Sequence, residues 1–172
     1  MKNPFSLIRA YSREARAIHE AGHAAAHHHF GHAIKFIEVH RANNGQWVGG
    51  TKSLTEAPNI DMSWRDDYVE RMKQHIFATV IGAVAEEYAT GGWNEAGYSG
   101  DEKVAFDYAY RLGYTGGEPV NEQLDAAKDW IGTPAAQTRI MTLAATLMET
   151  TVISGQIATR IMDEALIASV AD

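Results

Sequence analysis

The sequence predicts a mainly α-helical domain that carries a small β-hairpin or sheet. Most of its 172 residues lie in segments whose apolar residues recur at helical spacing, and glycine or proline breaks separate these segments. The exception is the stretch around residues 34–54, where β-type residues flank an Asn-Asn-Gly turn signal. A chain of this length, 45% hydrophobic and 22% charged, is expected to fold as one domain with a core.

The first expected helix spans residues 4–30, a segment rich in alanine, arginine and glutamate. Asn3 followed by Pro4 is typical of a helix start, and Gly31 is expected to end the helix. The hairpin or sheet follows directly, and its edge strand is expected to hold an extended substrate by main-chain pairing.

A second long helix is expected over about 64–90, with Ser63 as its cap. The segment TGGWNEAGYSG ends it, and a third helix is expected to begin near Ser99 or Gly100 and to run to about Leu112. Breaks at 132–134 and near 154–155 then divide the remaining chain into three helices, the last over about 156–168.

Composition excludes several classes of function. The formal charge of -7 comes from acids spread along the chain, without a basic stripe, so nucleic acid is not an expected partner. The most apolar run, 76–85, is too short to cross a bilayer, and the N-terminus has no signal-peptide core, so we expect a soluble, cytoplasmic protein without a membrane segment. Cysteine is absent, so any metal site must use His, Asp or Glu.

The segment AIHEAGHAAAHHHFGH, residues 17–32, contains the pattern H-E-x-x-H. His19 and His23 lie four residues apart, so on a helix their imidazoles project from one face and can share one zinc ion. Glu20 is turned about 100° from His19 and is placed to take a proton from an activated water. The pattern therefore predicts a catalytic metal site.

A catalytic zinc site usually has three protein ligands and one open position, so a third ligand is needed. The residues alone leave Glu86 or Glu87, on the second helix, and Asp101, near the start of the third, as candidates. His29 is excluded, since on a continuous helix it lies about 15 Å along the axis from His19.

The remaining histidines of this segment are expected to lie on the surface near the helix end, where partial positive charge suits the helix dipole. They are His27, His28, His29 and His32.

Several segments, in this order, resemble the peptidase domain of the FtsH family of ATP-dependent zinc proteases. They are HEAGHA (19–24), GGT (49–51), IGAVAEE (81–87), SGDEKVAFDYAYRLGY (99–114) and LMETTVISGQIATRIM (147–162). The resemblance implies an FtsH-peptidase-like helical fold of a zinc metallopeptidase.

The resemblance also implies a site. Carried over residue by residue, it makes His19, His23 and Asp101 the ligands of Zn²⁺ and Glu20 the base. Glu86 and Glu87 match the family's AEE segment and are expected to support the ligands or to pack the helix. Residues 1–116 would then build the metal-site core, and 117–172 a C-terminal helical part.

The expected function is a zinc-dependent peptidase that hydrolyses peptides or unfolded proteins through a metal-activated water. No G-x-x-x-x-G-K-[ST] occurs in the sequence, so we expect a free-standing peptidase that takes unfolded chains or relies on a separate ATP-dependent unfoldase. Because the resembled family works as rings, a homo-oligomer is also an expectation. Two alternatives stay open: a non-enzymatic FtsH-like metal-binding module that binds proteins, and a metal hydrolase of other amides or esters.

Overall fold

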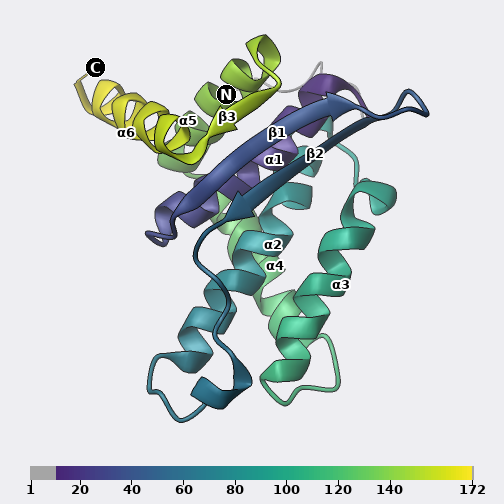
Figure 1. Ribbon diagram of the computed structural model, residues 1–172, viewed down its shortest axis with the longest axis vertical. Coiled ribbons are helices and arrows are strands. Elements are labelled where there is room, and N and C mark those ends of the chain that lie inside the picture. Colours follow the sequence, from purple (N-terminus) through teal and green to yellow (C-terminus); the bar gives the residue numbers. More distant parts are fainter. Residues whose placement is uncertain (1–10, 172) are drawn as a thin grey trace.

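The computed structural model describes residues 11–171, and over these residues the chain is mainly helical with one small antiparallel sheet (Figure 1). This confirms the predicted fold class, a mainly helical chain with a small sheet. The helices are α1 (Arg13–His29), α2 (Tyr68–Thr90), α3 (Glu95–Arg111), α4 (Glu118–Ile131), α5 (Pro134–Glu149) and α6 (Gly155–Ala171). The strands are β1 (Ile34–Arg41), β2 (Trp47–Ser53) and β3 (Val152–Ser154), and a 3-10 turn, η1 (Ile60–Met62), precedes α2.

The first helix is shorter than predicted, because Tyr11 and Ser12 are not helical. Tyr11 has a φ of 63°, and Ser12 caps α1, its Oγ accepting a hydrogen bond from the Ala15 amide at 3.0 Å. The predicted start at Pro4 lies outside the described residues. The other end agrees with the prediction, since Gly31 takes a φ of 71° just after the helix.

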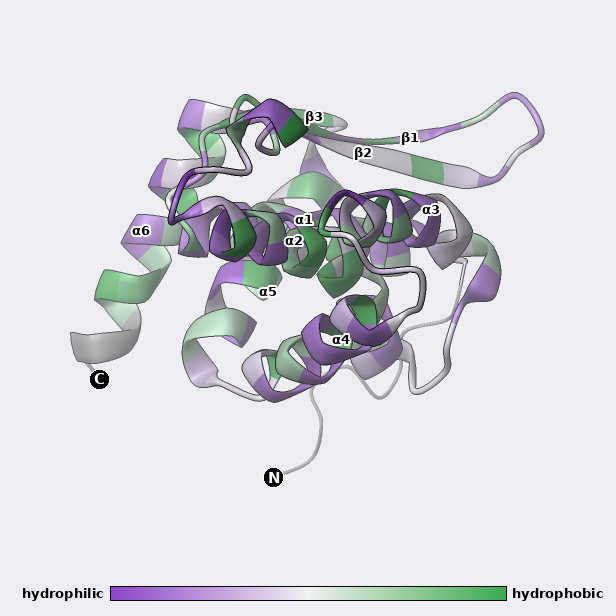
Figure 2. Ribbon diagram, turned by 90° about the horizontal axis from the view of Figure 1, so that it is seen from below, coloured by the Kyte–Doolittle hydropathy of each residue, from purple (hydrophilic) through white to green (hydrophobic). Residues whose placement is uncertain are grey.

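Helix α1 is the centre of the molecule, with the sheet on one side and α2 and α5 packed against it (Figures 1 and 2). Eleven of its residues are buried, and most of them are alanines. Small side chains let α2 come close: a Cβ on Gly22 would lie only 3.0 Å from the Ala85 Cβ. This close approach brings side chains of the two helices together at one site.

The predicted hairpin is present as β1 and β2, and Gly45 takes a φ of 84° in its turn. A third strand, β3, was not predicted; it pairs antiparallel with the other side of β1, which gives the order β2-β1-β3. Strand β2 is therefore an edge strand, with one side free of strand pairing.

Two helix starts differ from the prediction. Helix α2 begins at Tyr68 rather than near 64, and Ser63 instead follows the 3-10 turn. Helix α3 begins at Glu95, because Asn94 caps it by accepting a hydrogen bond from Gly97 N at 3.0 Å.

The C-terminal helices agree with the predicted breaks. Thr133 caps α5, and its Oγ1 accepts a hydrogen bond from the Ala136 amide at 3.3 Å, with Pro134 in the first turn. Helix α4 packs on α2, α5 packs on α1, and α6 packs on α5 and β1. Within residues 11–171, none of the helices combines the length and the apolar character that crossing a bilayer requires.

Candidate metal centre

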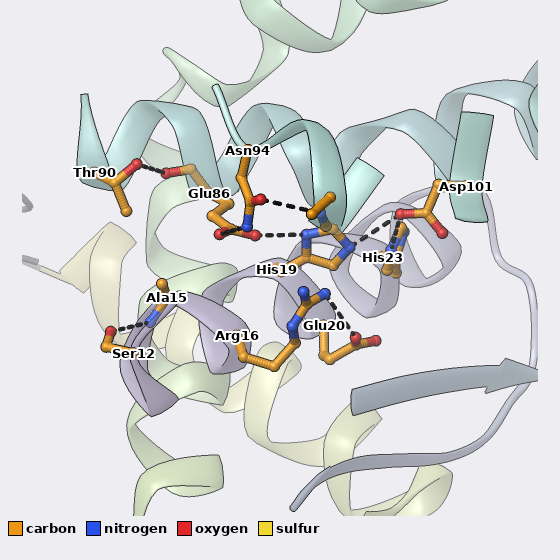
Figure 3. A network of polar contacts seen from close by, with 12 residues as sticks. Ser12, Ala15, Arg16, His19, Glu20, His23, Glu86, Thr90, Asn94 and Asp101 are labelled. Atoms are coloured by element: carbon orange, nitrogen blue, oxygen red, sulfur yellow. Dashed lines mark hydrogen bonds and ion pairs between the residues drawn. The ribbon is translucent and has the colours of Figure 1, made fainter. Parts of the chain in front are cut away.

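Three predicted ligands meet between α1 and α3. The Nε2 atoms of His19 and His23 lie 3.0 Å and 3.3 Å from Oδ2 of Asp101. All three ligand atoms fall within 4.8 Å of one another (Figure 3). Both histidines are buried, and Asp101 is partly exposed.

These distances suit a tetrahedral zinc site. Bonds of about 2.0–2.2 Å in a tetrahedron place neighbouring ligand atoms about 3.3–3.5 Å apart. The separations from Asp101 to the two imidazoles are close to that range, and the whole set lies within 4.8 Å, so one cation can be shared by the three groups once they draw together around it. Two imidazoles and one carboxylate leave a fourth position open, as catalytic zinc sites do.

Each histidine is oriented through its other ring nitrogen. Nδ1 of His19 donates to Oε2 of Glu86 at 3.0 Å, and Nδ1 of His23 donates to the Ala78 carbonyl at 2.7 Å. With Nδ1 protonated, the lone pair of a neutral imidazole is on Nε2, which faces Asp101. Such outer partners are typical of metal-ligating histidines.

Without a metal ion, the two imidazoles and the Asp101 carboxylate form a charged network. Burial raises the pKa of Asp101, but the charge of His23 and hydrogen bonds from His19 and His23 outweigh burial and leave that pKa well below its usual range. Burial lowers the pKa of His23, but Asp101 outweighs it and raises that pKa to about 9. A cation must therefore displace a proton here, so metal affinity depends on pH.

Glu86 connects the ligands to the start of α3. Its side chain is buried, and Oε1 accepts a hydrogen bond from Asn94 Nδ2 at 2.7 Å while Oε2 holds His19. Burial raises the pKa of Glu86, but hydrogen bonds from His19 and Asn94 outweigh it, so this carboxyl is ionised. Among the described residues, no hydrogen bond or ion pair joins the Glu87 side chain to the site.

Asp101 is not at a helix start, contrary to the sequence prediction. It lies six residues beyond Glu95, after the first turn of α3. Free N–H groups of a helix end therefore do not explain its position. Its partners are the two imidazoles.

Glu20 lies beside the ligands and at the edge of the sheet. The Thr51 hydroxyl donates to the Glu20 backbone carbonyl at 2.9 Å and lies 3.1 Å from Glu20 Oε2, and Arg16 Nη1 lies 3.8 Å from Oε1. A Cβ on Gly49 would lie 2.8 Å from Glu20 Oε1, so only glycine lets β2 pass this close to the carboxylate. The segment GGT (49–51), one of those that resemble the FtsH peptidase domain, thus lies directly against Glu20.

An open cleft of about 700 Å³ contains these groups. Helix α1 contributes His19, Glu20 and His23 to its wall, α3 contributes Asp101, and residues 49–53 of β2 line the opposite side. The unpaired edge of β2 therefore borders the site.

Only one of the four histidines that were predicted to lie on the surface, His29, is exposed. His32 is buried, His27 is partly buried, and His28, whose side chain is 13% exposed, forms an ion pair with Asp163 at 2.9 Å. Nδ1 of His27 lies 3.2 Å from Nδ1 of His32. The prediction was wrong for His27 and His32 because the chain turns back after Gly31 and folds His32 against α1. It was wrong for His28 because this side chain lies toward α6, where it pairs with Asp163.

His75 of α2, which sequence reasoning missed, completes a cluster with His27 and His32. Its ring stacks on His32 at a centroid distance of 4.7 Å. Burial lowers the pKa of His27 to about 3 and that of His75 to about 4, and the neighbouring imidazoles add to both shifts. The cluster is therefore neutral near pH 7.

Comparison with known protein families finds no family that matches this chain, and comparison with curated proteins finds no match either. The case for a function therefore depends on the geometry of this site and on the sequence patterns.

Proposed function

We propose that this chain is a zinc-dependent peptidase that hydrolyses peptides or unfolded proteins. The observation that carries the proposal is the convergence of His19, His23 and Asp101 beside Glu20 in an open cleft. A purely structural zinc site would have four closed protein ligands and no need of a base. The proposal includes the FtsH-like identity that the order of the sequence segments implies.

Zn²⁺, when bound, lowers the pKa of water and polarises the scissile carbonyl. Glu20 accepts the proton of the attacking water and returns it to the leaving amine. Thr51 holds Glu20 Oε2, and the packing of Gly49 against the side chain limits its movement. Glu86 and the Ala78 carbonyl keep the two imidazoles in the ligating orientation.

The edge of β2 is the proposed binding surface for an extended peptide. Residues 49–53 line the cleft, and strand β1 occupies only the other side of β2. An extended segment can pair with the open side and pass over the ligands. Folded proteins cannot present such a segment, so the proposed substrates are short peptides and unfolded chains, with a separate ATP-dependent unfoldase as a proposed partner for folded ones.

The test is cleavage of reduced, carboxymethylated lactalbumin by the zinc-loaded chain, beside Glu20→Gln prepared in the same way. We expect fragments from the wild type and a rate at least about a hundredfold lower from the variant, because a general base contributes about that much or more. Mass spectrometry of the fragments and zinc analysis of both proteins complete the measurement.

Equal cleavage by both proteins would mean that another protease produces the fragments. No cleavage by a wild type that holds one zinc per chain would contradict the proposal and favour the metal-stabilised binding module. Parallel assays with aryl esters and small amides would reveal a hydrolase of other substrates.

A further inference from the structure

The cleft is short on one side of the metal ligands and long on the other. On α3, Gly97 is the lining residue that precedes Asp101, whereas three lining residues follow it, the last being Arg111. On the sheet side, the lining begins at Gly49, opposite Glu20, and continues past the end of β2 to Ala57. A substrate therefore has room for many residues on one side of the site and few on the other.

Arg16 stands at the short end of the cleft. Its side chain is 17% exposed, and Nη1 lies 3.8 Å from Glu20 Oε1, which is too long for a hydrogen bond (Figure 3). A Cβ on Gly97 would lie 2.7 Å from Nδ2 of Asn94 and 3.2 Å from Nη2 of Arg16, so the guanidinium lies beside the first turn of α3. Within residues 11–171, no hydrogen bond uses the donors of this side chain.

We propose that Arg16 binds a carboxylate of the substrate, supplied by a free C-terminus or by an Asp or Glu side chain, next to the scissile bond. The inference depends on the proposed function and adds a substrate preference to it. A guanidinium presents two parallel N–H groups that fit one carboxylate. Glu20 does not occupy these two N–H groups, because its Oε1 lies 3.8 Å from Nη1, beyond hydrogen-bond distance.

The position of Arg16 determines how far this subsite lies from the scissile bond. Glu20 acts on the water that attacks the scissile carbonyl, and one residue of an extended chain spans about 3.4 Å. A guanidinium 3.8 Å from Glu20 is therefore within one or two residues of the bond that is cut. Because the cleft ends near Arg16, a chain terminus fits there without clashing with the wall.

The test compares internally quenched fluorogenic peptides. They share one sequence, which is taken from a cleavage site found in lactalbumin. One pair carries a C-terminal carboxylate or amide two residues after the scissile bond, and another carries an internal Glu or Gln there. For the wild type we expect a kcat/KM for the carboxylate member roughly tenfold to a hundredfold higher, mainly through KM. The two pairs separate the terminal from the side-chain source.

Variants assign this preference to Arg16. Arg16→Gln should reduce the carboxylate-to-amide ratio to about one, and Arg16→Lys, which keeps the charge but loses the fork, should reduce it partly. Lys103→Gln removes an exposed cation of α3 that does not line the cleft and should leave the ratio unchanged. Zinc content and thermal unfolding of each variant serve as folding controls, and Arg16→Lys carries the test if Arg16→Gln does not fold.

A second readout does not require catalysis. Fluorescein-labelled Ala-Ala-Leu-Ala-Ala, as free acid and as amide, is titrated with the metal-free chain, in which no zinc can ligate the carboxylate. Tighter binding of the acid, lost in Arg16→Gln, supports the subsite even if the chain cleaves nothing, which would overturn only the proposed function. Equal rates and affinities for acid and amide, or a uniform loss for all peptides in Arg16→Gln, would overturn the carboxylate subsite.

Discussion

Glu86 and Glu87 are neighbours on α2, yet only Glu86 reaches a ligand of the candidate metal centre. Glu86→Gln keeps the shape of the side chain but removes the charge that holds the His19 ring. We expect zinc affinity about tenfold to a hundredfold lower in this variant, the usual effect of losing such a partner. Glu87→Gln is the matched control and should bind zinc as the wild type does. Competition with a chromophoric chelator measures the zinc affinity of both variants, and equal affinities would show that Glu86 does not support His19.

The buried His75 makes stability depend on pH. Burial lowers its pKa to about 4, so between that value and about 6.5 the unfolded chain takes up a proton that the folded chain does not. Stability is thus full above pH 6.5 and is lost as pH falls toward 4, by about 1.4 kcal/mol per pH unit from this group at most. We expect His75→Phe, which keeps a ring against His32, to lose less stability between pH 7.5 and 5 in urea unfolding. A parallel decline of both proteins would contradict this.

Local spacing predicts only part of the site. The pairing of His19 with His23 follows from helix geometry alone, because four residues make about one turn. Asp101 and Glu86 come from other helices, so the sequence left both as candidates for the third ligand. Only the packing of α1 and α3 on α2 separates their roles. His75 carried no signal, since a lone histidine in an apolar helix has no partner until the chain folds.

At the scale of elements, the contact between α1 and α2 at Gly82 controls the ligand positions. An added methyl group there would overlap the His23 ring and lie 2.8 Å from Cδ2 of His19. We expect Gly82→Ala to reduce zinc affinity at least about tenfold and to destabilise the fold by about 1–3 kcal/mol, as overpacking does.

The control for that variant is Gly100→Ala, beside Asp101 on an open face of α3, where no atom lies within 4 Å of the added methyl. This change should raise the free energy of unfolding by about 0.5–1 kcal/mol through helix propensity, with unchanged zinc affinity. Urea unfolding and chelator competition measure both proteins. If Gly82→Ala behaved like Gly100→Ala, the contact would not control the ligands.

Element boundaries show why some of the fold escapes sequence reasoning. The breaks around α5 are encoded locally by Thr133 and Pro134 and were predicted. The start of α3 was placed too late, because Asn94 is both a cap and a partner of the distant Glu86. Strand β3 is three residues long and exists through its pairing with β1, which no local pattern reveals.

At the scale of the whole molecule, the metal centre joins three helices that bury very different amounts of surface. Helix α1 has eleven buried residues, whereas α3 has three, which are Tyr98, Ala105 and Ala109. Asp101 is the candidate ligand on α3, and Asn94 connects the start of this helix to α2 through Glu86. A cation bound at the centre therefore supports α3 more than it supports α1 or α5.

Metal removal should accordingly loosen one helix and not the whole fold. Any ion that binds only the folded chain stabilises it by about 2.7 kcal/mol when its free concentration is a hundredfold above its dissociation constant. We expect chelation to speed amide hydrogen exchange in α3, because few apolar contacts hold this helix in place, while exchange in α5 stays slow because that helix packs on α1 away from the ligands. Asp101→Asn should produce the same pattern with zinc present. Uniform acceleration over all helices would mean that the cation stabilises the core as a unit, and no change in α3 would mean that apolar packing alone holds it.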